Sequence, residues 1–201
     1  MKIGKFSYSA FVLALLANVA EAQQPVEGVH YEELSEPFGA SEDSVVNIFS
    51  PACPHCYRLE DGLKAWADEN DLYIVRVPFF HEDQWAELGR LIITMQETNN
   101  DQEDNITALF TAIHENDVEA DDVDALIDSL PISDEQTVLI EETYSSGAVS
   151  DREDEIRAWL LENRIRAIPA VVVNDKFFSD PARARGNDNL LLLLDHLTTI
   201  Q

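Results

Sequence analysis

Hydrophobic residues divide this chain into two parts with strand character and a long helical part between them. The runs 45–49 and 73–77 are short, apolar and rich in β-branched residues, which is typical of buried strands. A weaker run of the same kind lies at 30–34. Between the two strong runs, apolar residues recur at i, i+4 and i+7, which predicts one helix packed against a sheet: Leu59, Leu63 and Trp66.

The middle of the chain, from about residue 83 to residue 163, has helical spacing almost throughout. It predicts helices over 85–95, 106–113, 123–130, 134–144 and 150–160. Pro131 ends the third of these helices, because proline has no N–H and clashes with the preceding turn. Ser150 and Glu153 have the spacing of a capping box, so we expect the last of these helices to begin there.

Strand character returns after the helical part. The run 170–174 is apolar, and Asn174 with Asp175 predicts a hairpin turn into 176–178. A final helix is expected over 190–197. The order is therefore two strands, a helix, a strand, a block of helices, two strands and a helix.

The first residues have the form of a secretory signal. Lys2 and Lys5 precede an apolar stretch at 10–17, and Ala20-Glu21-Ala22 has the small-x-small form of a cleavage site. We expect residues 1–22 to be a signal peptide that is removed by cleavage after Ala22. The apolar stretch is too short to span a bilayer as a stable helix, so we expect no stable membrane insertion.

Charge excludes several classes of partner. The chain has 13 basic and 39 acidic residues, which gives a net charge of −26. Such a field repels nucleic acid and anionic membrane surfaces. The acidic runs 115–124 and 151–155 lack the glycine-centred spacing of an EF-hand loop, so we interpret them as solvated surface rather than calcium sites.

The only two cysteines lie in the tetrapeptide Cys53-Pro54-His55-Cys56, which follows the first buried strand. A disulfide across two intervening residues closes almost no loop and therefore adds little stability. We expect the pair to open a helix, where unpaired backbone N–H groups and the helix dipole favour a thiolate. The motif therefore indicates redox chemistry.

The same spacing could form half of a zinc site, but zinc would need two more ligands. No second cysteine pair exists, and the other histidines are scattered through unrelated segments. We therefore expect no bound metal, and we expect each of these histidines to be a surface residue: His30, His81, His114 and His196.

Two segments of the chain resemble segments of the DsbA family. Members of this family are thioredoxin-fold disulfide oxidoreductases of the bacterial periplasm. Residues 49–57, which include both cysteines, are similar to the family's active-site segment, and residues 166–174 to its second signature. The likeness extends over essentially all of the sequence after the signal peptide. It implies an α/β, thioredoxin-like fold with an inserted α-helical domain. The implied division is 1–22 signal peptide, 23–82 thioredoxin-like domain (first part), 83–163 helical insertion and connecting helix, and 164–201 thioredoxin-like domain (second part).

This resemblance and the chemistry of sulfur together suggest roles for the catalytic motif. Cys53, nearest the helix start, is expected to be the exposed sulfur that a substrate thiolate attacks, with Cys56 as its buried partner. His55 lies between them and can donate a hydrogen bond or positive charge to the Cys53 thiolate. Pro54 completes the catalytic set.

The second signature is expected to bind substrate. Pro169 lies in an apolar strand although proline cannot donate to a strand ladder. The family implies a cis peptide bond between Ile168 and Pro169 beside the active site, and such a bond would expose backbone groups to a visiting peptide.

The chain departs from the family pattern near the cysteines. Well-known members carry a buried acid six residues before the first cysteine, where this chain has Asn47. The approach to the cysteines is often aromatic in the family, but here it is Pro51 and Ala52. Arg76 is a lone cation in an apolar strand. It could lie near the buried end of the site, but we expect it to snorkel to the surface.

The implied function is that of a periplasmic thiol:disulfide oxidase without a cofactor. It would donate the Cys53–Cys56 disulfide to newly exported cysteine-containing proteins, be reoxidised by a membrane partner resembling DsbB, and act as a monomer. An isomerase or reductase on the same fold is an alternative, although isomerases of this type usually carry a dimerisation module ahead of the redox domain. Two further candidates are a peptide-binding chaperone with incidental cysteines and a copper or zinc carrier that uses Cys53, His55 and Cys56.

Overall fold

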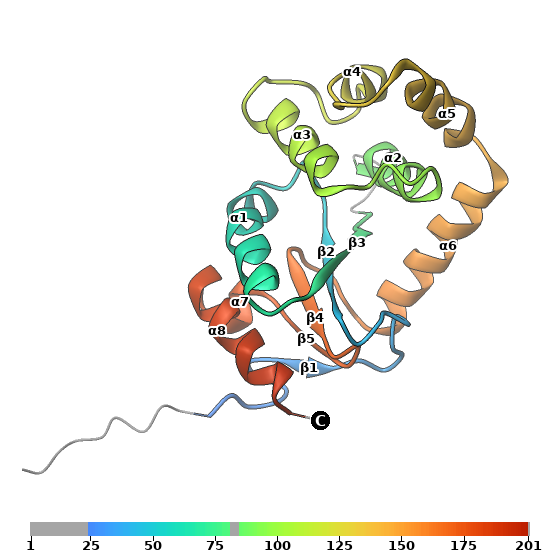
Figure 1. Ribbon diagram of the computed structural model, residues 1–201. Coiled ribbons are helices and arrows are strands. Elements are labelled where there is room, and N and C mark those ends of the chain that lie inside the picture. Colours follow the sequence, from blue (N-terminus) through green and yellow to red (C-terminus); the bar gives the residue numbers. More distant parts are fainter. Residues whose placement is uncertain (1–23, 81–84, 201) are drawn as a thin grey trace, which may run out of the picture.

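The computed structural model describes residues 24–80 and 85–200 (Figure 1). The expected signal peptide, residues 1–22, and His81 lie outside this part of the chain. Within the described ranges, none of the helices has the length and hydropathy that a transmembrane span requires.

A five-stranded sheet with the order β1-β5-β4-β2-β3 forms the centre of the fold. The strands are β1 (Glu32–Glu33), β2 (Ser44–Phe49), β3 (Tyr73–Pro78), β4 (Ala170–Val173) and β5 (Phe177–Ser179). β2 runs parallel to β3 and antiparallel to β4, and β5 is antiparallel to both β4 and β1. Every residue of β2 is buried, which explains why this strand appears in the sequence as an almost uninterrupted apolar run.

Helices cover both faces of the sheet (Figure 1). On one face, α1 (Pro54–Glu69) and α8 (Asn187–Thr198) share an apolar cluster with alternate residues of β2 and β4, such as Val45 and Val171. On the other face, α6 (Gly147–Glu162) packs on the opposite set of strand residues, such as Val46. The short helix α7 (Pro181–Ala184) connects β5 to α8.

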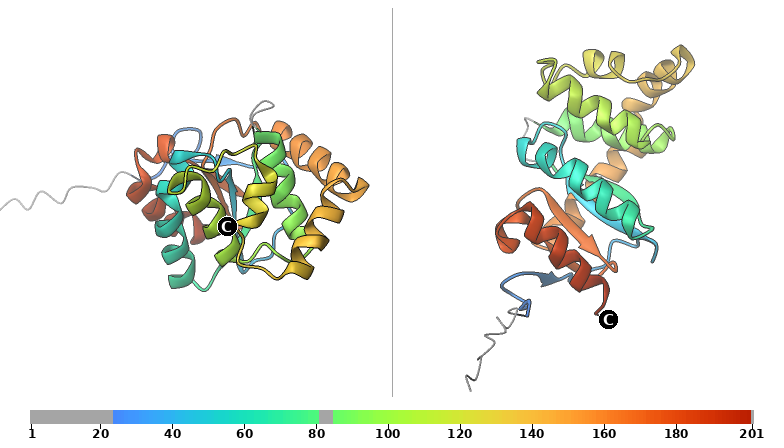
Figure 2. Two further views of the ribbon diagram at one scale, coloured as in Figure 1. Left: turned by 90° about the horizontal axis from the view of Figure 1, so that it is seen from above. Right: turned by 60° about the vertical axis from the view of Figure 1, so that its left-hand side comes forward.

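The helical insertion stands at one end of the sheet (Figure 2). It consists of α2 (Ala86–Glu97), α3 (Glu103–His114), α4 (Val123–Asp128) and α5 (Asp134–Tyr144). Its core includes Leu88, Ile106 and Leu109, and the same cluster contains both cysteines. The cysteines therefore lie where the insertion meets the sheet domain.

The hairpin turn between β4 and β5 confirms the sequence prediction. Asn174 has a φ of 56° and Asp175 a φ of 50°, so both central residues of the turn are left-handed, as a type I′ turn requires. The Asp175 carboxylate also accepts hydrogen bonds from the backbone N–H groups of Phe38 and Gly39, at 2.8 Å each.

Two expectations about helices were wrong. α6 begins at Gly147 rather than at 150, because the Ser146 side chain caps it by accepting from the Val149 N–H. The capping box is instead at the start of α5, where Ser133 and Gln136 cap each other. The helix α7 was not expected, because four residues are too few to show a helical period.

Candidate active site

The two cysteines lie at the N-terminus of α1. Cys53 is the capping residue with an extended backbone, and Pro54 occupies the first helical position, where its missing N–H costs nothing. Cys56 lies one turn inside the helix. Both cysteines are free thiols, so this is the dithiol form of the pair.

A β-turn connects the end of β2 to the first cysteine. Pro51 and Ala52 form the centre of this turn, and the Cys53 N–H donates to the Ser50 carbonyl at 3.0 Å. The Ala52 N–H donates to the Ser50 hydroxyl at 3.3 Å. The strand and the turn together fix where Cys53 enters the helix.

The surroundings of the two sulfurs shift their pKa values in opposite directions. A hydrogen bond from the Cys56 thiol, assisted by the backbone N–H groups of Cys56 and His55, lowers the pKa of Cys53 to about 6 against the effect of burial. The electrostatic contribution of His55 is the smallest of those that lower it. Burial, donation to Cys53 and the nearby negative charges of Cys53 and Glu60 raise the pKa of Cys56. At neutral pH, Cys53 is therefore the thiolate and Cys56 the thiol.

The expectation that Cys53 is exposed was wrong. Its exposed fraction is 4%, close to the 2% of Cys56. The reason is that Ala52 and Ile168 pack against the apolar cluster that contains both cysteines. Electrostatic surroundings, rather than a large difference in exposed area, distinguish the two sulfurs.

His55 and Pro54 are exposed. The His55 Nδ1 atom lies 2.8 Å from Nη2 of Arg58. Because a guanidinium can only donate, Nδ1 is the accepting nitrogen and carries no proton in this arrangement. Arg58, which sequence reasoning did not single out, therefore fixes the orientation of the imidazole.

The second signature lies beside the motif, as expected. The Ile168–Pro169 peptide bond is cis. Ile168, Pro169 and His55 line a hollow of about 210 Å³, together with Asp180 and Ala182 of the segment around α7. The structure thus brings both signatures to one surface.

Arg76 does not snorkel to the surface. Its exposed fraction is 2%, and its guanidinium donates to both carboxylate oxygens of Glu60, at 2.8 and 2.6 Å. It also donates to Glu103 of α3 at 2.7 Å. The two carboxylates offset the cost of burying the cation, which is why it can remain inside. Glu60 was missed in the sequence, although it falls four residues after Cys56 on the buried face of α1.

Asn47 occupies the position of the acid found in well-known family members. It is buried, with an exposed fraction of 3%, and its Cα pairs with that of Arg76 across β2 and β3. Among the described residues, its Oδ1 atom finds no hydrogen-bond partner. The amide is uncharged, so it can be buried here without the counter-ion that a carboxylate would need.

His114 is not the plain surface residue that the sequence suggested. Its Nε2 atom lies 2.8 Å from the Pro51 carbonyl oxygen, and its ring stacks on Tyr57 with 4.5 Å between centroids and an interplanar angle of 15°. The Tyr57 hydroxyl donates to Glu115 at 2.7 Å. These contacts join the end of α3 to both flanks of the cysteine motif.

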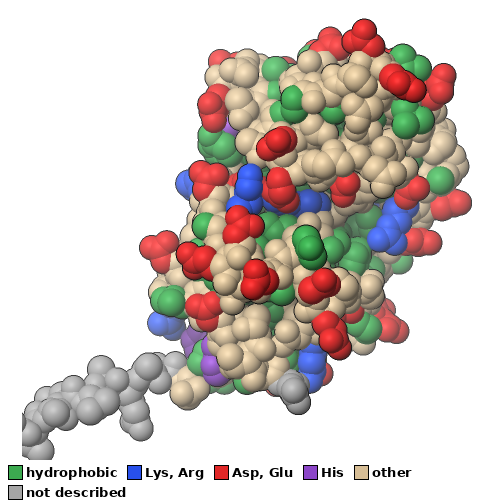
Figure 3. All heavy atoms as spheres, viewed as in Figure 1, with side chains coloured by type: hydrophobic (Ala, Val, Ile, Leu, Met, Phe, Trp, Pro, Cys, Tyr) green, Lys and Arg blue, Asp and Glu red, His purple; other side chains and the backbone are tan. Residues whose placement is uncertain are grey.

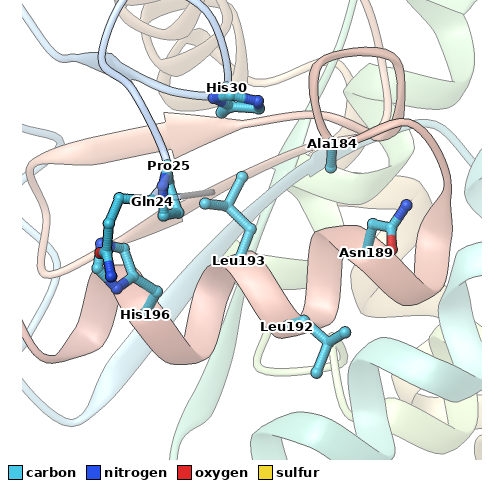
Figure 4. Close-up of a pocket in the computed structure, with 8 residues that line it drawn as sticks. All are labelled: Gln24, Pro25, His30, Ala184, Asn189, Leu192, Leu193 and His196. Carbon is cyan, nitrogen blue, oxygen red and sulfur yellow. The ribbon is translucent and has the colours of Figure 1, made fainter. Parts of the chain in front are cut away.

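The other two described histidines lie elsewhere. His30 and His196 line a hollow of about 510 Å³ between the N-terminal segment and α8 (Figure 4). His30 accepts a hydrogen bond from the Val26 N–H at 3.0 Å.

Acidic side chains are spread over the surface rather than gathered at one site, as the visible face in Figure 3 shows. In the described ranges, no three His, Cys, Asp or Glu side chains are grouped as metal ligands would be.

The chain is similar to known proteins in both structure and sequence. No protein-family model matches the chain. The thiol:disulfide interchange protein DsbA of Pseudomonas aeruginosa is 28% identical over 189 residues, which are 92% of this chain and 89% of that protein. The crystal structure of Pseudomonas aeruginosa DsbA has a TM-score of 0.75 and 26% identity, and the match covers 89% of this chain and 95% of that one.

A complex of Proteus mirabilis DsbA with a non-covalently bound peptide shares the fold alone. Its TM-score is 0.68 at 18% identity, with coverage of 88% of this chain and 100% of that chain. The expected fold class, α/β and thioredoxin-like with an inserted helical domain, is confirmed.

Proposed function

We propose that this chain, which belongs to the DsbA family of thiol:disulfide oxidoreductases, donates a disulfide between Cys53 and Cys56 to newly exported proteins that contain cysteines. The observation that carries the proposal is the opposite shift of the two cysteine pKa values. A stabilised Cys53 thiolate stabilises the dithiol form, so the disulfide form accepts electrons readily.

The exchange takes place in two steps. A substrate thiolate attacks Cys53 Sγ of the disulfide, a bond forms between these sulfurs, and the Cys53–Cys56 bond breaks. Cys56 leaves as a thiolate and takes up a proton, in keeping with its raised pKa. A second substrate thiolate then attacks the substrate sulfur of the mixed disulfide and releases the Cys53 thiolate. The substrate loses two electrons, and the protein gains them.

The lowered pKa of Cys53 suits the second step, in which Cys53 is released. With a pKa of about 6, Cys53 is a good leaving group at neutral pH, because the released thiolate needs no proton. In the reverse direction the same property would make it a weak reductant. This favours the oxidase over the reductase or isomerase on the same fold.

We assign substrate binding to the hollow beside the motif. Ile168 and Pro169 line it together with His55, so a peptide that docks there lies next to the cysteine motif. An extended peptide would pair there with the backbone of residues 168–169, as peptides pair with exposed strand edges. His55 and Pro54 are exposed and would border the bound segment.

The remaining parts of the proposal concern the cellular setting. We place the protein in the periplasm after removal of residues 1–22, as a monomer that needs no cofactor and is reoxidised by a membrane partner resembling DsbB. The proposed domain boundaries are 23–82 and 164–201 for the thioredoxin-like domain and 83–163 for the helical insertion with its connecting helix.

The equilibrium of the disulfide with glutathione tests the proposed function. We expect the dithiol form to predominate at ratios of reduced to oxidised glutathione at which a structural disulfide would remain intact. A disulfide that resists reduction under these conditions would favour the reductase. Full activity in a variant without both cysteines would favour the chaperone, and stoichiometric copper or zinc in the reduced protein would favour the metal carrier.

A further inference from the structure

His114 contacts the polypeptide on both sides of the cysteine motif. Pro51 lies two residues before Cys53, and its carbonyl oxygen is 2.8 Å from Nε2 of His114. Tyr57 directly follows Cys56, and its ring stacks on the His114 ring. A single residue of the helical insertion therefore bridges the two flanks of the motif.

The contact with Pro51 falls on the most rotatable part of the turn. Pro51 and Ala52 are the central residues of the β-turn from Ser50 to Cys53, so the Pro51 carbonyl belongs to its central peptide. The common turn types differ mainly by a rotation of this peptide, and one of them requires a positive φ at the third residue. Ala52 is not among the residues with positive φ. A donor on the Pro51 carbonyl holds the peptide in the observed orientation.

The chemistry of the partners assigns the proton. A carbonyl oxygen can only accept, so Nε2 of His114 carries the hydrogen and donates it. The ring is kept in place from its face by Tyr57, whose hydroxyl is bonded to Glu115 at 2.7 Å. His114 is half-buried, which protects the hydrogen bond from competing water.

We propose that His114 is a positioning residue for the Cys53–Cys56 centre, acting by holding the Pro51–Ala52 peptide and hence the place of Cys53 at the start of α1. This inference rests on the proposed function, in which Cys53 is the reactive sulfur.

The Pro51–Ala52 peptide can affect the Cys53 thiolate because it sets the hydrogen-bond geometry around the Cys53 sulfur. The thiolate is stabilised by the Cys56 thiol and by the backbone N–H groups of His55 and Cys56, all of which belong to α1. Cys53 itself is carried by the turn. If the turn is free to rotate, the sulfur moves relative to these donors, and hydrogen bonds weaken steeply as they lengthen or bend.

Substitutions at His114 can separate its donor from its ring. His114→Gln and His114→Met have the same length, but only the glutamine side chain can donate to the Pro51 carbonyl. His114→Phe keeps a ring that can stack on Tyr57 and lacks the donor. His196→Phe is the matched control, because His196 also lies in the last turn of a twelve-residue helix, at the hollow shown in Figure 4.

Two readouts on the full chain test the proposal: the titration of the Cys53 thiolate, followed by its ultraviolet absorbance, and the equilibrium with glutathione. We expect His114→Met and His114→Phe to raise the titration midpoint by about half to one pH unit and to shift the equilibrium about threefold to tenfold toward the disulfide. His114→Gln should stay within about twofold of the unsubstituted protein, and His196→Phe should match it.

The outcomes separate this proposal from the proposed function. If the unsubstituted protein itself titrates as an ordinary thiol, the proposed function fails. If it has the lowered midpoint and His114→Met leaves both readouts unchanged, the role of His114 is overturned. Equal shifts in His114→Met and His114→Gln would overturn it too, since the donor would then not be the cause. The glutamine and methionine variants decide the question even if His114→Phe does not fold.

Discussion

Arg76 of β3 forms a buried ion pair with Glu60, which lies four residues beyond Cys56 on the helix that carries the cysteines. The side chain of Arg76 is 1% exposed and that of Glu60 is 7% exposed, and two hydrogen bonds of 2.8 and 2.6 Å join them. Glu103 completes the network from α3, so it also joins the helical insertion to the sheet. Each of the two buried charges, on Arg76 and on Glu60, is stabilised only while the other is present.

Removing the cation should therefore destabilise the fold strongly. We expect Arg76→Met to lower the free energy of unfolding by about 3–5 kcal/mol, because it leaves the Glu60 carboxylate buried without its partner. Urea unfolding of the disulfide form would measure the change. Arg152→Met is the control: Arg152 pairs with Glu155 at 2.9 Å on the surface, and its removal should cost less than about 1 kcal/mol. Equal losses in the two variants would contradict the assignment.

The strands and the hairpin could be predicted from the sequence because local chemistry decides them. β2 and β4 are buried on both faces and therefore appear as continuous apolar runs. Asn174 and Asp175 are residue types that tolerate the left-handed conformation of the turn. The start of α6 was misplaced because Ser150 satisfies the local capping pattern, whereas the preceding turn of helix starts at Ser146.

The supporting residues of the site could not be predicted, because their contacts join distant parts of the chain. His114 and Pro51 are 63 residues apart, and nothing near either of them indicates the contact. Glu60 was detectable as an acid on the apolar face of α1, but its partner Arg76 lies on another element. The cysteines were found because the whole motif is contiguous.

The order of the exchange predicts which cysteine variant captures substrates. Cys56→Ser should accumulate mixed disulfides with exported proteins, because the Cys53 thiolate can still attack a disulfide of such a protein and release one of its sulfurs as a thiolate, while no Cys56 thiol is present to resolve the product. Non-reducing electrophoresis after acid quenching would reveal them. Cys53→Ser is the matched control and should accumulate few. Capture by Cys53→Ser alone would reverse the two roles.

The unpartnered oxygen of Asn47 predicts a stabilising substitution. A buried polar atom without a hydrogen bond costs about 1–3 kcal/mol, so Asn47→Leu, which keeps the size of the side chain, should raise the free energy of unfolding by about 1 kcal/mol or more. Asn105→Leu is the control and should lower the free energy of unfolding. Asn105 is also buried, but its side chain donates to the Asn100 carbonyl at 2.8 Å, and leucine cannot make this hydrogen bond. Denaturant unfolding would measure the free energy of unfolding of both variants. A loss of stability in Asn47→Leu would contradict the prediction and would mean that Asn47 Oδ1 has a hydrogen-bond partner such as bound water.

The lowered pKa of Cys53 finally predicts how the stability of the dithiol form depends on pH. Its folded pKa of about 6 lies below the unfolded value, so its stabilisation is complete above the unfolded pKa and is lost as pH falls through the folded pKa. At pH 7 it amounts to at most about 1.4 kcal/mol, and solvent screening reduces this. The effect of Cys56 on stability has the opposite sign. Its raised pKa leaves it neutral in both states below the unfolded value and destabilises the fold only above it.

The stability advantage of the dithiol form should therefore grow from pH 6 to about pH 8 and shrink toward pH 5. Paired thermal melts of the two redox forms across this range would measure it, because the disulfide form contains the same carboxylates and no thiol. A disulfide form that melts higher at pH 7, or a difference between the forms that does not change with pH, would mean that Cys53 is not a stabilised thiolate.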